Sequence, residues 1–211
     1  MITMTTKNTY KILAILAALA AMFMSACTSE PPHKAQPKPL DLLTGRSAFQ
    51  KCYIQARGWQ ADAQPFRLAS QPTSDSDGHE GKADVWSAWF GSASLGRMKA
   101  FAWSGTSAAD APDRGVTLAG QDSYSPGNSS THAFNIGFIK IDSDAAFDVA
   151  QKHGGDKILQ QDPKTPVFYL LDWSTATNQL IWHVVYGPQR AGAKLAISVD
   201  ATTGEFIRVE K

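Results

Sequence analysis

The stretch Ile181-Trp182-His183-Val184-Val185-Tyr186-Gly187, followed by Leu195-Ala196-Ile197-Ser198-Val199-Asp200, decides the fold of this chain. Alternate side chains of a strand point to the same face, so both segments predict half-buried strands, and we expect the two strands to pair antiparallel. Residues 200–204 read Asp-Ala-Thr-Thr-Gly and predict a tight turn, because glycine adopts positive φ and aspartate and threonine bond to nearby backbone donors. With an extended run at 206–209, the sequence predicts a three-stranded antiparallel meander.

The same strand pattern occurs earlier, as Val85-Trp86-Ser87-Ala88-Trp89-Phe90-Gly91. Trp86 lies 96 residues before Trp182, and Trp103 lies 96 residues before Val199. Agreement between separate registers is the mark of an internal repeat. The sequence therefore predicts a duplication with a period of just under 100 residues.

Helical patterns precede both sets of strands. Residues 45–57 carry apolar residues at helical spacing, with Thr44 as a possible cap and Gly58 as a stop, and residues 145–153 do the same before Gly154-Gly155. Phe49 and Phe147 correspond at an offset of 98. We expect an α+β fold of two repeats, each a helix packed on an antiparallel β-sheet, over residues 44–132 and 133–211.

The N-terminal 26 residues predict a cleaved secretory signal. Lys7 and Lys11 precede an unbroken apolar run at 12–23, which is too short to span a bilayer comfortably. The run ends in Met24-Ser25-Ala26-Cys27, which resembles the bacterial lipobox. This resemblance implies diacylglycerol on Cys27, cleavage before it, and acylation of the new amino terminus by a fatty acid such as palmitate; an ordinary signal peptide is the alternative. By analogy with enteric bacteria, Thr28 favours the outer membrane, facing the periplasm, over the inner membrane.

Residues 27–43 predict a solvated tether, because Pro31, Pro32, Pro37 and Pro39 prevent a helix or a central strand. Cleavage after residue 26 removes two lysines and leaves 18 basic and 19 acidic residues, so the mature chain has no basic excess that would attract nucleic acid.

No cofactor or metal site is expected from the sequence. The acidic stretch at 73–82 lacks the glycine and acid spacing of a calcium loop, and Ala83 stands where a zinc protease motif needs its second histidine. We expect a solvated hairpin loop there. With Cys27 lipidated, Cys52 has no partner for an intramolecular disulfide and is expected to be a small buried residue.

Three motifs follow one another in residues 140–211. They are Asp144-Ala145-Ala146-Phe147-Asp148-Val149-Ala150 with Gly154-Gly155, then Trp182-His183-Val184, then Val199-Asp200-Ala201-Thr202-Thr203-Gly204-Glu205. Together they resemble the PepSY domain, whose pattern is an alanine-rich helix, a Trp-x-Val strand and an Asp-Ala-x-Thr-Gly-Glu turn. The first repeat has Ser104-Gly105 in place of that turn. The resemblance implies a helix against an antiparallel sheet and roles in protease propeptides, inhibition and envelope binding, and it supplies no catalytic residues.

Two functional hypotheses follow. The first is a non-enzymatic, lipid-anchored envelope module that binds a protein or peptide, as a protease inhibitor or an assembly factor, with strand edges open to β-augmentation. Its candidate binding surface is Trp86, Trp89, Trp103 and Trp182, although strands with aromatic residues on both faces favour core packing first. The second is an envelope hydrolase that uses His183, Asp172 and Ser174, brought together by folding.

Overall fold

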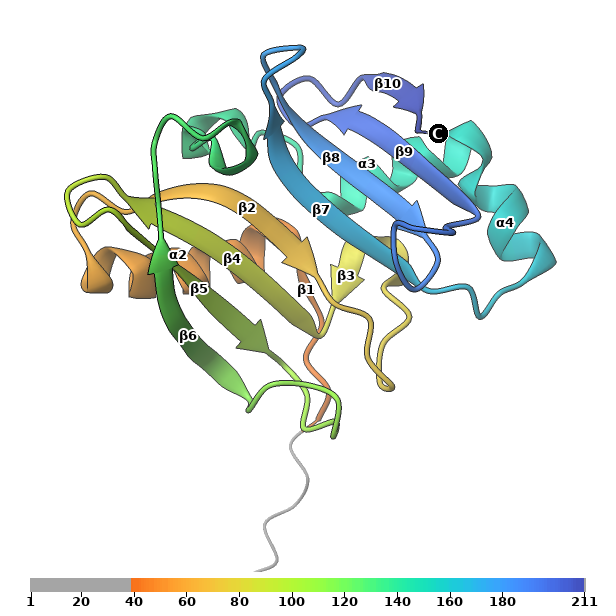
Figure 1. The fold of residues 1–211 in the computed structure, drawn as a ribbon. Helices are drawn as coiled ribbons and strands as arrows, with labels where there is room; N and C mark the ends of the chain where they lie inside the picture. The colour runs from red at the N-terminus through yellow and green to blue at the C-terminus, as the bar shows by residue number, and fades with distance from the viewer. Residues whose placement is uncertain (1–38, 211) are drawn as a thin grey trace, which may run out of the picture. The chain divides into compact units, whose positions relative to one another are not determined.

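The structure of this chain is a computed structural model that describes residues 39–210, within the compact unit Lys38–Lys211. The predicted signal peptide, Cys27 and the tether before residue 39 lie outside the described residues. Figure 1 shows the arrangement of helices and strands.

An eight-stranded antiparallel sheet forms the body of the molecule, in the order β10-β9-β8-β7-β2-β4-β5-β6. Its strands are β2 (Gln64–Ser70), β4 (Val85–Ser92), β5 (Arg97–Ser104), β6 (Gly115–Ser123), β7 (Val167–Ser174), β8 (Gln179–Tyr186), β9 (Leu195–Asp200) and β10 (Phe206–Val209). The expected α+β class and the C-terminal meander, with Trp182 opposite Val199, are confirmed.

One seam joins the strands from the two parts of the chain. Strand β2 pairs antiparallel with β7 through Arg67 and Asp172, Leu68 and Leu171, and Ala69 and Leu170. A second, two-stranded sheet joins β1 (Leu43–Thr44) to β3 (Lys82–Ala83). Because β2 and β7 are both central strands, the main sheet runs without interruption from β10 to β6.

Both longer helices pack on the same face of the sheet (Figure 1). Helix α2 (Gly45–Trp59) lies on β4 and β5, and α3 (Ser143–Ala150) lies on β8 and β9. In α2 the buried residues Ala48, Phe49, Cys52 and Ala56 recur at helical spacing, so a single apolar stripe faces the sheet. Within residues 39–210, no helix covers the opposite face of the sheet.

The core beneath these helices centres on two indole rings. Trp86 and Trp182 are both 0% exposed, and their ring centroids lie 6.4 Å apart in an edge-to-face arrangement. Trp86 Nε1 donates to Leu43 O at 2.9 Å, and Trp182 Nε1 donates to Ile141 O at 2.9 Å. Each indole thus buries its ring and still satisfies its only donor.

The N-terminus of α2 is capped from a distant part of the chain, in place of the expected cap at Thr44. The Thr44 side chain makes no capping bond to the helix. Instead, Gly45 N donates to Ser143 Oγ at 2.7 Å and Arg46 N donates to Asp142 Oδ1 at 2.8 Å. Asp142 also caps its own helix α3 through Ser143 N. One polar corner therefore fixes the ends of both helices.

The second helix does not stop at Gly154-Gly155 as predicted. After α3 the chain makes a π-helical turn, η5 (Gln151–Gly155), and continues as α4 (Asp156–Gln161). Gly154 absorbs the irregularity with a φ of 114°. The glycine pair is a kink within a longer helical segment, since glycine permits the conformation without ending the helix.

The stretch 73–82 is built into the core in part and is not the solvated loop that the sequence predicted. Tyr169 Oη donates to Gly78 O at 2.7 Å and accepts from Gly81 N at 3.0 Å, beside the short helix η2 (His79–Gly81). Gly81 is buried, and a Cβ there would lie 2.2 Å from Asp144 Cα, so only glycine fits. The remaining short helices are η3 (Ser129–Thr131) and η4 (Ile136–Phe138).

Candidate functional site

Three of the four tryptophans expected at a binding surface lie in the core. Trp86 and Trp182 are 0% exposed and Trp103 is 4% exposed. This placement corrects the prediction, because alternation along β4, β5 and β8 turns these side chains toward the helices. Trp89 occupies the opposite face of β4 and is half-buried.

Trp89 belongs to the open face, by which we mean the sheet face without helices. Register places Trp89 beside Arg67 of β2 and Ala100 of β5. Across the seam the same face is continued by Phe168 and Leu170 of β7, which are also half-buried. The open face therefore carries two half-buried aromatic rings, Trp89 and Phe168.

A hollow of about 460 Å³ lies on the open face. Ser87, Trp89 and Phe168 line it from the sheet, and residues 188–190 line it from the loop between β8 and β9. The hollow is thus bounded by rigid strands on one side and by a connecting loop on the other.

Arg67 supplies an unused donor to the open face. Its Nε is buried, and no hydrogen-bond acceptor among the described residues reaches it. Asp172 is its cross-strand neighbour on β7, but no ion pair joins the two side chains. A buried donor without an acceptor costs about 1–3 kcal/mol, so an acceptor for this donor would stabilise the open face.

A charged cluster occupies the C-terminal half of the same face. His183 is 5% exposed, and its Nε2 lies 3.2 Å from Asp172 Oδ1. Its Nδ1 is hydrogen-bonded to Glu210. Ser198 Oγ donates to Glu210 Oε1 at 2.7 Å, and Arg190 pairs with Glu210 Oε2 at 2.5 Å.

The two carboxylates favour the charged form of His183. Burial alone lowers the pKa of His183, but its hydrogen bonds to the carboxylates of Asp172 and Glu210 outweigh this effect and raise the pKa. For Glu210, burial raises the pKa, while His183, Ser198 and Arg190 together lower it to about 2. Glu210 is therefore ionised near neutral pH, and the cluster stabilises positive charge on His183.

The structure brings together only part of the predicted hydrolase set. Asp172 contacts His183, but Ser174 Oγ accepts from Thr177 N at 3.3 Å and makes no bond to His183. Ser198, which pairs with His183 across β8 and β9, donates to Glu210 instead. Since carboxylates occupy both ring nitrogens, His183 has no nitrogen available to accept a serine proton.

Sequence reasoning missed Arg67, Phe168, Ser198 and Glu210. The alternation of residues 167–174 could have placed Phe168 opposite the helices, and the β8–β9 register could have placed Ser198 beside His183. No local signal marks Arg67 or Glu210, because their neighbours come from strands far away in the chain.

Cys52 is the small buried residue that the sequence predicts. It is 0% exposed, and its Sγ donates to Phe101 O at 3.3 Å. Burial raises the pKa of the thiol to about 12, so almost no thiolate exists near neutral pH. Within residues 39–210, no group of three His, Cys, Asp or Glu side chains has the geometry of a metal site.

Strand β6 is one free edge of the sheet and β10 is the other. Strand β6 has nine residues, and its second half is exposed, whereas β10 has four.

No helix within the described residues is long and apolar enough to cross a membrane.

No protein-family model and no curated protein matches this chain. Among solved structures, it is similar to a crystal structure of a "putative lipoprotein" from Clostridium difficile 630, with 12% sequence identity and a TM-score of 0.49. The match covers 84% of this chain and 95% of the other. A likeness this distant carries no inference about what this chain binds or where it is anchored.

Proposed function

We propose that this chain is a lipid-anchored module of the bacterial cell envelope that binds a partner protein on its open face and catalyses no reaction. One observation carries the proposal: the half-buried rings of Trp89 and Phe168 line a hollow, and Trp89 lies beside Arg67, whose Nε has no acceptor among the described residues. Tryptophan and arginine dominate the residues that contribute most to protein interfaces. The open face has this composition on a rigid support.

The partner we propose presents a carboxylate among apolar side chains. Trp89 and Phe168 offer apolar area, and beside Trp89 lies Arg67, whose Nε has no acceptor among the described residues. Asp172 does not compensate for Arg67, because it is engaged with His183. A protease that is inhibited and a protein that is assembled in the envelope are both partners of this kind.

Lipid on Cys27 is the proposed anchor, and its support is the lipobox-like Met24-Ser25-Ala26-Cys27. Two or more acyl chains give stable anchoring, since each buried methylene contributes about 0.8 kcal/mol. Thr28 favours the outer membrane. Cys27→Ser should release the chain from the membrane fraction of its host, and mass spectrometry of the native N-terminus should show the acyl chains.

The organisation we propose is a tandem of PepSY-like repeats, 44–132 and 133–211. Matched contacts support it: Trp86 donates to Leu43 O and Trp182 donates to Ile141 O, with donors 96 and acceptors 98 residues apart. The two four-stranded sets also follow mirrored orders outward from the seam. Both relations are expected when two copies of one unit pack about a pseudo-twofold axis.

The test is differential capture from an envelope extract. Residues 28–211 contain the whole compact unit and its core, and are immobilised as wild type, as a Trp89→Ala/Phe168→Ala variant, and as Ile54→Ala. Ile54 is the matched control, because it is 68% exposed on α2, on the other side of the sheet. A partner retained by the wild type and by Ile54→Ala, but lost from the double variant, supports the proposal.

Equal retention by all three proteins would place binding elsewhere, and no retention by any of them would count against a protein partner. A photoreactive residue at position 87, inside the hollow, should cross-link the retained protein, whereas the same residue at position 54 should not. Melting curves of the variants establish that each is folded.

The alternative function is an envelope hydrolase that uses His183, although both ring nitrogens of this residue are engaged by Asp172 and Glu210. Any hydrolysis that depends on this cluster should disappear in His183→Gln and persist in Ser174→Ala, because Ser174 makes no contact with the histidine.

A further inference from the structure

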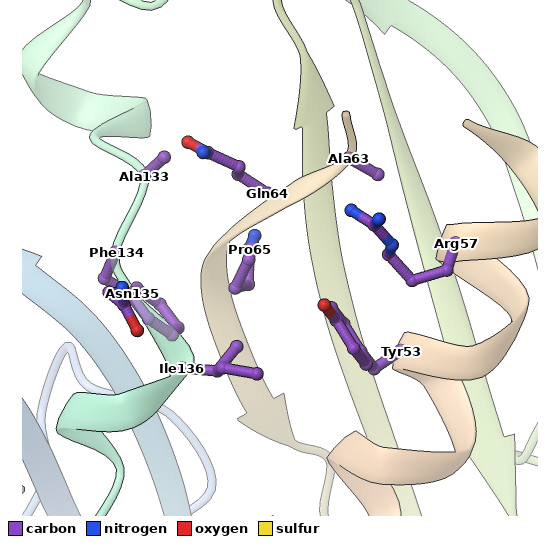
Figure 2. Close-up of a pocket in the computed structure, with 9 residues that line it drawn as sticks. All are labelled: Tyr53, Arg57, Ala63, Gln64, Pro65, Ala133, Phe134, Asn135 and Ile136. Atoms are coloured by element: carbon purple, nitrogen blue, oxygen red, sulfur yellow. The ribbon is translucent and has the colours of Figure 1, made fainter. Parts of the chain in front are cut away.

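A cavity of about 310 Å³ lies apart from the open face, beside helix α2. Its walls come from the end of α2, from the start of β2 and from the chain at 133–136, which leads into η4. Figure 2 shows Tyr53 and Arg57 reaching into the space from the helix, with Pro65, Asn135 and Ile136 across from them.

The walls of this cavity are fixed by the fold. Phe134 N donates to Pro65 O at 2.9 Å and joins the 133–136 segment to β2. The Tyr53 ring stacks on Phe49, with centroids 5.8 Å apart. Asn135 Oδ1 accepts from Gly137 N at 2.8 Å, which fixes the start of η4. A cavity formed in advance spares a ligand the cost of ordering it.

Among the described residues that line the cavity, Arg57 is the one with a charged side chain. It stands one helical turn after Tyr53, so the guanidinium and the phenol share a face of α2. No ion pair or hydrogen bond engages the Arg57 side chain within the described residues. Asp62, on the connection from α2 to β2, forms no ion pair with Arg57. The Asp62 carboxylate instead accepts from Ser92 Oγ at 2.7 Å and from Ser94 N at 2.9 Å.

The rest of the lining combines apolar side chains with the amides of Gln64 and Asn135. Pro65 and Phe134 are buried, and Ile136 is 43% exposed beside them. In Figure 2 Ile136 lies beside Pro65 and faces Tyr53, away from the guanidinium of Arg57, so the cavity has one charged end and one apolar end. Its volume is at the lower limit for ligand sites, so it suits a small ligand or the end of a longer one.

We propose that this cavity binds a carboxylate attached to a small apolar group. Arg57 pairs with the carboxylate, for which the planar guanidinium is the best-matched side chain. The Tyr53 hydroxyl donates a further hydrogen bond, and Pro65, Phe134 and Ile136 enclose the apolar group. The C-terminal residue of a peptide and a small free acid both present this chemistry. The site is independent of the open face, so neither proposal depends on the other.

The experiment compares ligands that differ only in charge. N-acetyl-leucine and N-acetyl-leucinamide are titrated into residues 28–211 labelled with ¹⁵N, and amide shifts are followed by NMR. We expect the acid to bind at least ~10-fold more tightly than the amide, because a charge-assisted bond is lost with the amide. The shifts should concentrate at residues 53–65 and 133–136. Equal affinities, no binding of the acid up to 10 mM, or shifts elsewhere would overturn the proposal.

Variants on one helix supply the controls. Arg57→Gln should remove the preference for the acid and Arg57→Lys should restore part of it. Lys51→Gln, which removes the same charge from an exposed position of α2 outside the cavity, should leave the preference unchanged. An equal loss in Lys51→Gln and Arg57→Gln would show that only net charge matters. Acetyl-Gly-Gly-Leu then distinguishes the sources: tighter binding than N-acetyl-leucine identifies a peptide terminus, and weaker binding identifies a small acid.

Discussion

The two halves of the open face have similar strand positions but differ in burial. In the C-terminal half, Ile181, His183, Val185 and Ser198 are at most 5% exposed, and Glu210 and Arg190 hold charges over them. In the N-terminal half, the matching positions on β4 and β5, such as Ser87, Trp89 and Ala100, stay half-buried. One half of the face is thus closed by its own chain, and the other is left open.

This difference shows how one sheet separates stability from recognition. The closed half satisfies its polar groups internally, since His183, Ser198, Asp172 and Glu210 bond to one another. In the open half, the Nε of Arg67 has no acceptor among the described residues, and the rings of Trp89 and Phe168 remain partly exposed to solvent. Substitutions should therefore reduce stability in the core and in the closed half, and should reduce binding in the open half.

The largest loss of stability is expected in the helix-covered core. Trp182→Ala should lower the free energy of unfolding by about 3–5 kcal/mol, because a fully buried indole leaves a cavity and Ile141 O loses its donor. Trp86→Ala should cost a similar amount. Denaturant unfolding followed by circular dichroism measures both. A decrease in the free energy of unfolding below 1 kcal/mol for either variant would mean that the two indoles contribute little to the stability of the core.

The closed half should respond next, and in a pH-dependent manner. Glu210→Gln should cost about 1.5–3 kcal/mol at pH 6, since it weakens charged hydrogen bonds with His183 and Arg190. Because the pKa of Glu210 is lowered, its contribution to the free energy of unfolding is fully present above pH 4.5. This contribution is lost as the pH falls toward 2.

The raised pKa of His183 has the opposite consequence. Its contribution is complete below the unfolded value of about 6.5 and is lost as the pH rises through the folded value. The stability of the wild type should therefore be highest between about pH 4.5, set by Glu210, and about pH 6.5, set by His183. The stability of Glu210→Gln should vary less with pH. Melting temperatures from pH 3 to 9 test this, and parallel curves for the two proteins would contradict it.

A smaller change in stability, of opposite sign, is expected at Asp84, which lies between β3 and β4. Asp84 is 0% exposed and its Oδ1 has no hydrogen-bond partner, although Thr73 Oγ1 donates to Oδ2 at 2.6 Å. Burial, aided by Asp75 and Asp110, raises its pKa, so the ionised form destabilises the fold. Asp84→Asn should raise the free energy of unfolding at pH 7 by up to ~1 kcal/mol.

That gain should disappear near pH 3, where Asp84 is protonated in both states of the wild type. Thr73→Val, which removes the hydroxyl donor to this carboxylate, serves as the control and should lower the free energy of unfolding at pH 7. A loss of stability in Asp84→Asn at pH 7 would show that the charge is needed there.

The smallest effect on stability is expected on the open half. Trp89→Ala should change the free energy of unfolding by less than about 1 kcal/mol, because the ring is only half-buried. The same variant, together with Phe168→Ala, should lose the partner. A loss of 3 kcal/mol or more, measured by denaturant unfolding, would mean that Trp89 is structural like Trp182.

Patterns within short segments predicted the fold well. The alternation at 181–187 and 195–200 gave a strand pair that the register confirms, and the apolar spacing at 45–57 gave α2. These features depend on residues close in sequence. The same alternation also contained the reason why Trp86 and Trp182 are buried, because one face of each strand must meet a helix.

Features formed by distant residues could not be predicted. The cap of Gly45 by Ser143, the contact of Tyr169 with Gly78 and Gly81, and the bond between His183 and Glu210 join parts of the chain that share no local pattern. The candidate site was predicted only in Trp89. Its other members, Arg67 and Phe168, are neighbours because β2 pairs with β7, and one sequence does not specify that choice.

The seam between β2 and β7 also has a kinetic consequence. The other pairings of the large sheet join strands that follow one another in the chain, while the seam joins Arg67 to Asp172. Long loops close at a greater entropic cost, so we expect the hairpins to form early and the seam to close last. Until it closes, β2 and β7 each present a free edge of matching shape. A second copy in the same state could supply the missing strand, and exchanged dimers are therefore the misfolded product to expect at high concentration.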